Sequence, residues 1–370
     1  MKALKNYSFA LLAGLALLTS CGSDGESGPK TEYDRQAMLT NYAENLIVPG
    51  YQSFKTEAAE MATAVSAFTA NPSTAALATA RKEYLDAYKE WQKVSMYEFG
   101  PADEQMLRTN LNIFPTTTSQ IENNISSGTY DLQTTANMSA KGFPALDYLL
   151  YTNASDAEVV ALYTSAPNAA NRKKYLQDIT NLIKQRAEAT YSTWTTNNYS
   201  QTFKAAAGTA VGSAVGNLVN QLNFDIDVTK RAKVGIPSGR FTAGSALPEK
   251  VEAFYSKTSL ELLKEAIRAE KAVFMGQSAS GANGPGLDDY LDHVGAMYNG
   301  GLLSEAIEAQ FDAALAAANA VQGPLSVAVT AQPQAVTKLY DELQKLIVLT
   351  KTDMPSALGV AITYTDNDGD

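Results

Sequence analysis

Residues Ser73 to Phe99 read STAALATARKEYLDAYKEWQKVSMYEF, and this stretch decides the fold class. Its apolar residues recur at steps of three and four. They are Leu77, Ala80, Tyr84, Ala87, Tyr88, Trp91 and Val94. This spacing places them on one side of an α-helix as a broad apolar stripe. Such a stripe must be buried against neighbouring helices, so the stretch predicts one long helix of a helical bundle.

The same periodicity continues through most of the chain, and alternating β-branched stretches are rare. Runs rich in Ala, Leu, Lys and Glu favour helices. Further helices are expected at about 35–70, 104–113, 143–151, 156–164, 169–196, 206–228, 249–275, 301–320 and 334–350. The sequence therefore predicts an all-α fold.

The helical pattern breaks between about 229 and 248, where residues 234–248 read VGIPSGRFTAGSALP. Irregular connections of this length are uncommon unless they are functional or lie between domains. We place the domain boundary near residue 205, with one helical bundle over 35–205 and a second over 206–370. Gly208, Gly212 and Gly216 are expected on one helix face, where small residues allow a neighbouring helix to approach closely.

The N-terminus has the pattern of a bacterial lipoprotein signal. Two lysines precede an apolar run from Phe9 to Leu18, and Leu-Thr-Ser leads to Cys21. We expect residues 1–20 to be removed and Cys21 to carry the lipid. Residues 21–34 would be a flexible tether. The expected location is the cell envelope, lipid-anchored at the outer membrane on its periplasmic side or at the cell surface. The acidic residues after Cys21 resemble a surface-export signal.

Cysteine content and charge exclude several classes of protein. Cys21 is the single cysteine, so the mature chain is expected to have no internal disulfide and no thiolate metal site. The formal net charge is −10, and no cluster of Lys and Arg is dense enough to follow a phosphate backbone. Nucleic acid is therefore not an expected partner.

Three carboxylates occupy positions where apolar residues are expected. Glu98 falls on the buried stripe if the first helix continues that far, Asp147 shares a face with Phe143 and Leu150, and Glu252 shares one with Tyr255. A buried carboxylate must be paired, hydrogen-bonded, neutral or bound to metal. Each also has a simpler explanation: Glu98 could mark a helix end before Gly100, and the other two could favour a helix start.

Familiar catalytic motifs are absent from the sequence. His293 is the single histidine and has no partner at a metal-ligand spacing, so it is expected to lie on a helix surface. No nucleophile elbow, Walker loop or dinucleotide fingerprint is present. The tail from Asp366 to Asp370 resembles the opening of a calcium loop but has its Gly in the wrong position.

Four segments together resemble the imelysin-like family, which includes the insulin-cleaving metallopeptidase, iron-regulated exported proteins and the iron-uptake protein EfeO. The segments are Trp91 to Pro101, Gly142 to Leu150, Glu252 to Ser256, and the tail from Pro355 to Asp370. The resemblance implies two all-helical domains that each resemble a four-helix bundle. It also implies a site between them built around Gly-x-His-x-x-Glu.

This chain departs from that motif, because Pro144 stands at the His position and Asp147 at the Glu position. Hydrolytic zinc sites normally need three protein ligands, so peptidase activity is not expected. The resemblance still implies a polar ligand pocket, and Asp147 and Glu98 are the candidate ligands for iron or another divalent metal. The residues expected to line this pocket are Glu98, Asp147, Arg240 as a counter-charge, Glu252, Tyr255 and Ser256.

The function expected from this resemblance is capture of iron, haem or another small ligand outside the inner membrane, as part of iron uptake. Two alternatives remain open at this point. One is an imelysin-type metallopeptidase, and the other is a non-catalytic lipoprotein that docks onto an outer-membrane receptor.

Overall fold

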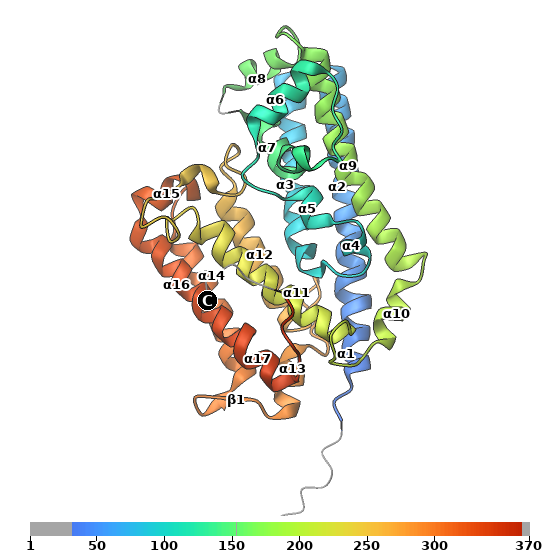
Figure 1. The fold of residues 1–370 in the computed structure, drawn as a ribbon, viewed down its shortest axis with the longest axis vertical. Coiled ribbons are helices and arrows are strands. Elements are labelled where there is room, and N and C mark those ends of the chain that lie inside the picture. Colours follow the sequence, from blue (N-terminus) through green and yellow to red (C-terminus); the bar gives the residue numbers. More distant parts are fainter. Residues whose placement is uncertain (1–31, 153, 365–370) are drawn as a thin grey trace, which may run out of the picture. The chain divides into compact units, whose positions relative to one another are not determined.

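The computed structural model describes residues 32–152 and 154–364, and the prediction of an all-α fold is confirmed (Figure 1). The chain from Tyr33 onward forms one compact unit. The predicted signal segment, Cys21 and the tail from Asp366 lie outside the described residues. A domain boundary near residue 205 stays a prediction.

The N-terminal half is built from helices and short helical turns. They are α1 (Arg35–Asn41), the π-helical turn η1 (Tyr42–Ile47), α2 (Val48–Ala70), α3 (Thr74–Val94), the 3-10 turn η2 (Ser95–Tyr97), α4 (Pro101–Glu104), α5 (Leu107–Leu111), α6 (Thr118–Ser127), η3 (Thr135–Ala140), α7 (Gly142–Tyr151), α8 (Asp156–Leu162), α9 (Ala169–Thr195) and α10 (Tyr199–Ala205).

The C-terminal half is also helical, with one short hairpin. Its elements are α11 (Ala214–Val228), the π-helical turn η4 (Thr229–Gly235), η5 (Pro248–Lys250), α12 (Ser259–Phe274), α13 (Leu287–Val294), β1 (Met297–Tyr298), β2 (Gly301–Leu302), α14 (Leu303–Ala320), α15 (Leu325–Ala331), α16 (Pro333–Val348), η6 (Leu349–Asp353) and α17 (Met354–Leu358). Strands β1 and β2 pair in antiparallel orientation.

Helix α3 is the long helix predicted from the stretch after Ser73. The Ser73 hydroxyl accepts a hydrogen bond from the Ala76 amide and caps the helix N-terminus. The predicted apolar stripe, from Leu77 to Val94, is buried. The α-helix ends at Val94 and continues as a 3-10 turn, so the residues after it do not follow the stripe.

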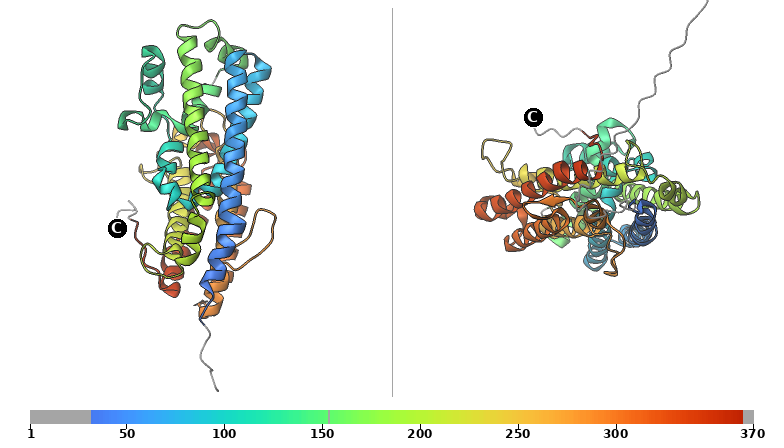
Figure 2. Two further views of the ribbon diagram at one scale, coloured as in Figure 1. Left: turned by 90° about the vertical axis from the view of Figure 1, so that its right-hand side faces the viewer. Right: turned by 90° about the horizontal axis from the view of Figure 1, so that it is seen from below.

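Each half packs as a bundle of long helices. In the N-terminal half α2 contacts α3 and α9, and α7 contacts α3 and α9; the views in Figure 2 show α2 and α9 side by side. In the C-terminal half α12 and α16 both contact α14, and α11 contacts α12 and α16. The halves meet where α3 contacts α12 and η2 contacts α11. One buried hydrophobic cluster runs through both.

Three predicted helix boundaries were wrong. Helix α11 begins at Ala214, so Gly208 and Gly212 precede it, and only Gly216 belongs to the helix. The helical path does not break at residue 229 but continues through η4 to Gly235. Helix α12 begins at Ser259 instead of 249, so Glu252 lies in the turn segment before it.

No single helix among the described residues is long and apolar enough to cross a membrane. Helices α14 and α15 are together long and apolar enough to do so by length and composition, but they meet at an angle of 84°.

Candidate functional site

A cavity of about 270 Å³ lies where the two halves meet. Helix α3 and turn η2 contribute one wall, α5 and the residues after it a second, and α11 with η4 a third. Its polar lining residues are Gln92, Ser95, Arg108, Thr109, Asn112, Asp225 and Lys233, and its apolar ones are Trp91, Ile113, Phe114, Phe224, Val228 and Ala232.

A buried ion pair supports one side of this cavity. Lys233, on η4, places its Nζ 3.0 Å from Oε2 of Glu252, and both side chains are at most 5% exposed. The Lys233 ammonium also donates to the side-chain oxygen of Gln92. Removing two charges from water costs several kcal/mol unless their partners are well placed, so this pair holds η4 and the turn before α12 against α3.

Glu252 is held by more than its lysine. Its Oε1 accepts hydrogen bonds from Tyr88 Oη (3.1 Å), Gln92 Nε2 (3.2 Å) and Asn112 Nδ2 (2.8 Å). The simple explanation that Glu252 favours a helix start was therefore wrong, since the residue is buried before the helix begins and is bound from three elements. Charge-assisted bonds of this kind fix a side chain in one position.

Asp225 and Arg108 form the second charged group of the wall. Asp225 Oδ2 accepts a hydrogen bond of 3.0 Å from Ser95 Oγ, and its Oδ1 lies 3.5 Å from Arg108 Nη2. The Arg108 guanidinium donates to the Ser95 carbonyl at 2.8 Å and stacks on the ring of Phe224. Burial raises the pKa of Asp225, and the nearby Arg108 and Lys233 charges lower it in part.

Glu270, on α12, extends this polar group into the core. The side chain is fully buried, and its Oε1 accepts a bond of 2.6 Å from Thr229 Oγ1. Its Oε2 accepts no hydrogen bond from the described residues. Burial and then the charge of Asp225 raise the pKa of Glu270 well above its usual value, which favours the protonated form.

Asp147 is buried as predicted, and its partners are two backbone amides and one tyrosine hydroxyl. Oδ2 accepts from the Tyr255 amide (2.7 Å), while Oδ1 accepts from the Ser256 amide (3.0 Å) and the Tyr84 hydroxyl (3.1 Å). Burial raises the pKa of Asp147 to about 6, although these hydrogen bonds oppose the shift. Asp147 thus fastens the turn before α12 to α7 and is not merely a helix-start residue.

Glu98 does not lie on the α3 stripe, because the α-helix ends before it. Both of its carboxylate oxygens accept from the Arg108 amide, at 3.0 and 3.1 Å, near the start of α5. Burial raises the pKa of Glu98 to about 7. The structure does not bring Glu98, Asp147 and Glu252 together as one set of metal ligands. Among the described residues, the carboxylates whose oxygens are close enough to share an ion are a different trio.

Arg240 lies away from these carboxylates. It is exposed, donates to Asp341 Oδ1 at 2.8 Å and stacks on Tyr340, both on α16. The prediction that Arg240 is the counter-charge in the pocket was therefore wrong, and Lys233 is the cation that pairs with Glu252. Asp147 and Tyr255 instead line a smaller cavity of about 200 Å³ together with Pro144. Ser256 contributes its amide to Asp147.

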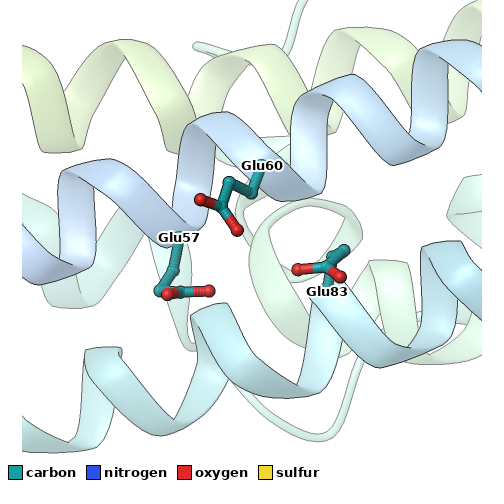
Figure 3. Close-up of side chains that lie close together, drawn as sticks. All are labelled: Glu57, Glu60 and Glu83. Carbon is teal, nitrogen blue, oxygen red and sulfur yellow. The ribbon is translucent and has the colours of Figure 1, made fainter.

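The trio with close oxygens is Glu57 and Glu60 on α2 and Glu83 on α3 (Figure 3). Their oxygens lie within 4.8 Å of one another. Glu60 is exposed, and Glu83 is already paired with Lys82 at 3.0 Å. Burial is the largest cause that raises the pKa of Glu57, and the neighbouring carboxylates raise it further. We do not place the functional site here, because exposed acidic clusters of this kind commonly occur without an ion.

His293, the single histidine, lies apart from all of these groups. His293 lies on α13, and its ring centroid is 5.4 Å from that of Tyr33. The site near α3 is therefore built without histidine, and its oxygen donors come from Asp225 and from the Gln92 and Asn112 amides.

Sequence reasoning missed all seven polar residues that line this cavity, including Gln92, Arg108, Asp225 and Lys233. One available signal was the spacing of Asp225, Thr229 and Lys233, which places polar groups four residues apart on one face of a helical path. The π-helical turn that carries Lys233 was hidden by the expected helix end at 228.

Comparison with known proteins identifies the family of this chain. The family model described as imelysin, peptidase M75, matches residues 47–351. Iron-regulated protein A of Synechococcus elongatus is 21% identical over 360 residues, which is 91% of each chain. Two crystal structures share the fold.

One of these structures is a protein assigned as an iron-regulated protein A precursor from Parabacteroides distasonis, with a TM-score of 0.73, 20% identity, and coverage of 90% of this chain and 97% of that one. The other is an imelysin-like protein from Psychrobacter arcticum, with a TM-score of 0.67, 17% identity, and coverage of 89% and 97%. At these identities the structural likeness establishes the fold alone.

Proposed function

This chain belongs to the imelysin family, and on that premise we propose that it is a lipid-anchored binding protein of the cell envelope that serves iron uptake through the cavity between α3, α5, α11 and η4. The observation that carries the proposal is the wall of this cavity. Asp225 and Lys233 are buried in this wall at the junction of two helical bundles, and the buried Glu252 pairs with Lys233. Clusters of buried charge beside a cavity are costly and concentrate at functional sites.

The chemistry of the wall indicates the kind of ligand. Lys233 and Arg108 are positive, Asp225 is a carboxylate, and Gln92 and Asn112 are amides, so charges of both signs face the cavity. A bare metal ion would meet two cations. An iron ion held by a small carboxylate chelator suits both signs, because its carboxylates face Lys233 and Arg108 and the metal side faces Asp225 and hard oxygen donors.

The cavity volume of about 270 Å³ supports a small chelate over haem. Pockets that enclose drug-sized ligands have volumes of roughly 300–1,000 Å³. The iron-regulated relative adds support for iron, since its name ties that protein to iron. We do not propose peptide hydrolysis, because Pro144 supplies no ligand at the position where the family motif has His.

The protein's two tryptophans make a direct test available. Trp91 lines the cavity, whereas Trp194 packs in a separate aromatic group with Phe99, Tyr199 and Phe203. A Trp194→Phe variant leaves Trp91 as the sole fluorophore. We expect ferric citrate to change Trp91 emission in a saturable way, because the ligand would lie against its wall.

The matched variant is Asp225→Asn in the same background, which should weaken the saturable change at least about tenfold through loss of a charged contact. Glu60→Gln, in the exposed acidic trio, is the control and should leave the titration unchanged. Absence of any saturable change with ferric citrate, ferrous ion or haem would reject the proposed ligand site.

A further inference from the structure

The hairpin between α13 and α14 exposes apolar side chains. Met297 is 62% exposed and Tyr298 is 37% exposed. The turn Asn299-Gly300 has positive φ at both residues, 49° and 88°, as a tight two-residue hairpin turn requires. The Leu303 amide donates to the Ala296 carbonyl at 3.0 Å, which closes the hairpin onto the start of α14. The two side chains are therefore presented on a rigid support.

The chain enters the compact unit at the same end of the molecule. Tyr33 donates its hydroxyl to the Gly286 carbonyl at 3.2 Å, just before α13, and its ring stacks on Tyr290 with centroids 4.6 Å apart. Figure 1 shows α1, α13 and β1 together at one end. Tyr33 is thus fastened to the helix that leads into the hairpin.

The length of chain before Tyr33 limits where a lipid on Cys21 can lie. Eleven residues separate the two, and they include three Gly and two Ser. A chain of this length reaches at most about 40 Å. The helical run from α1 through α2 ends at Ala70, about 54 Å from its start at a rise of 1.5 Å per residue. A lipid on Cys21 would therefore be limited to about 40 Å from Tyr33, which is less than the length of that helical run.

We propose that the β1–β2 hairpin rests in the surface of the lipid bilayer and orients the anchored protein, with Met297 and Tyr298 in contact with lipid. This inference rests on the proposed lipid anchor at Cys21. Tyrosine favours the membrane interface because its ring is apolar and its hydroxyl is polar. The hairpin adds contact area to a single anchoring point, which by itself would leave the protein free to tumble.

The charges around the hairpin specify the type of membrane. Asp289 and Asp292 on α13 and Glu305 on α14 are exposed and acidic, so an anionic surface would repel this end. The surface that fits is zwitterionic lipid such as phosphatidylethanolamine.

The test uses the full-length acylated protein in phosphatidylethanolamine vesicles. Because Cys21 is the single cysteine and would carry the lipid, a Met297→Cys variant has one free thiol for a nitroxide spin label. Asn71→Cys is the matched control, since Asn71 is exposed at the far end of α2. Electron paramagnetic resonance measures how accessible the spin label is to two probes, a water-soluble nickel chelate and oxygen, which concentrates in lipid. Each label is measured on the acylated protein in vesicles and on a Cys21→Ser protein in detergent-free buffer.

The label at position 297 is expected to lose nickel accessibility and gain oxygen accessibility in vesicles, while the label at position 71 stays in water. A protein that floats with the vesicles but keeps the 297 label as accessible to nickel as the 71 label overturns the hairpin contact and leaves the anchor intact. A protein that does not float overturns both the anchor and the inference. A Tyr298→Ser change should make the 297 label more accessible to nickel without releasing the protein.

Discussion

The buried pair of Lys233 and Glu252 allows a strong quantitative prediction. Their charged atoms are 3.0 Å apart and both side chains are nearly excluded from solvent. With an effective dielectric constant of about 20, two unit charges at this distance attract by about 5.5 kcal/mol, of which desolvation consumes a part. Replacing Lys233 by Met leaves the Glu252 carboxylate buried without its cation. We expect the free energy of unfolding to fall by about 3–5 kcal/mol.

The double variant Lys233→Met with Glu252→Gln should recover much of that loss, because no uncompensated charge remains buried. The control is Lys338→Met, which removes a lysine that is 65% exposed and bonds to Glu342 one helical turn away. Glu342 is only 6% exposed but keeps its ion pair with Lys345, so we expect the loss of the exposed Lys338 to cost less than about 1 kcal/mol. Urea unfolding, followed by circular dichroism and by tryptophan fluorescence, measures all three variants. A Lys233→Met loss no greater than the Lys338→Met loss would refute the assigned role of the pair.

Three further predictions concern pH, one buried carboxylate and one glycine. Burial raises the pKa of Asp147 to about 6 and of Glu98 to about 7, so between about pH 4 and 7 the native state binds more protons than the unfolded chain. Stability should therefore fall as pH rises through that window, and the urea midpoint should be higher near pH 5.5 than near pH 7.5. The difference between the two midpoints should be smaller in Glu98→Gln. A midpoint that rises with pH would contradict this. Asp147→Ala should cost about 2–4 kcal/mol, since two backbone amides lose their acceptor, and those amides should exchange hydrogen faster by mass spectrometry; unchanged exchange would count against the assignment. Gly142→Ala should abolish or strongly reduce the yield of folded protein, because φ is +75° and the new Cβ would lie 2.2 Å from the Leu111 carbonyl oxygen. The control Gly281→Ala should still fold, because at φ +85° its Cβ would meet open space. Equal yields of the two variants would refute the steric argument.

The sequence predicted the fold well because the fold depends on periodic burial. The apolar stripe from Leu77 to Val94 is buried as its spacing required. The positions of carboxylates were harder to interpret. Asp147 and Glu252 were correctly expected to be buried. Most of their hydrogen-bond partners, such as Tyr255 for Asp147 and Tyr88 for Glu252, lie more than a hundred residues away in the sequence, and no local pattern identifies such partners.

Errors at the site had local physical causes. The family resemblance directed attention to Asp147 and to a counter-charge on the long loop, yet Arg240 pairs with α16. Lys233 takes the predicted role because a π-helical segment of seven residues continues α11 to Gly235 and carries Lys233, which donates to Gln92. Insertion of such a turn is not visible in a four-residue repeat.

We propose that iron is bound in the cavity beside Asp225. The most direct measurement is diffraction at the iron absorption edge from crystals of the full-length protein prepared with ferric citrate. We expect an anomalous peak inside the cavity, near the carboxylate of Asp225 and facing Lys233 and Arg108, and loss of that peak in Asp225→Asn. A peak at Glu57, Glu60 and Glu83 instead, or no iron peak at any concentration of ferric citrate, would contradict it.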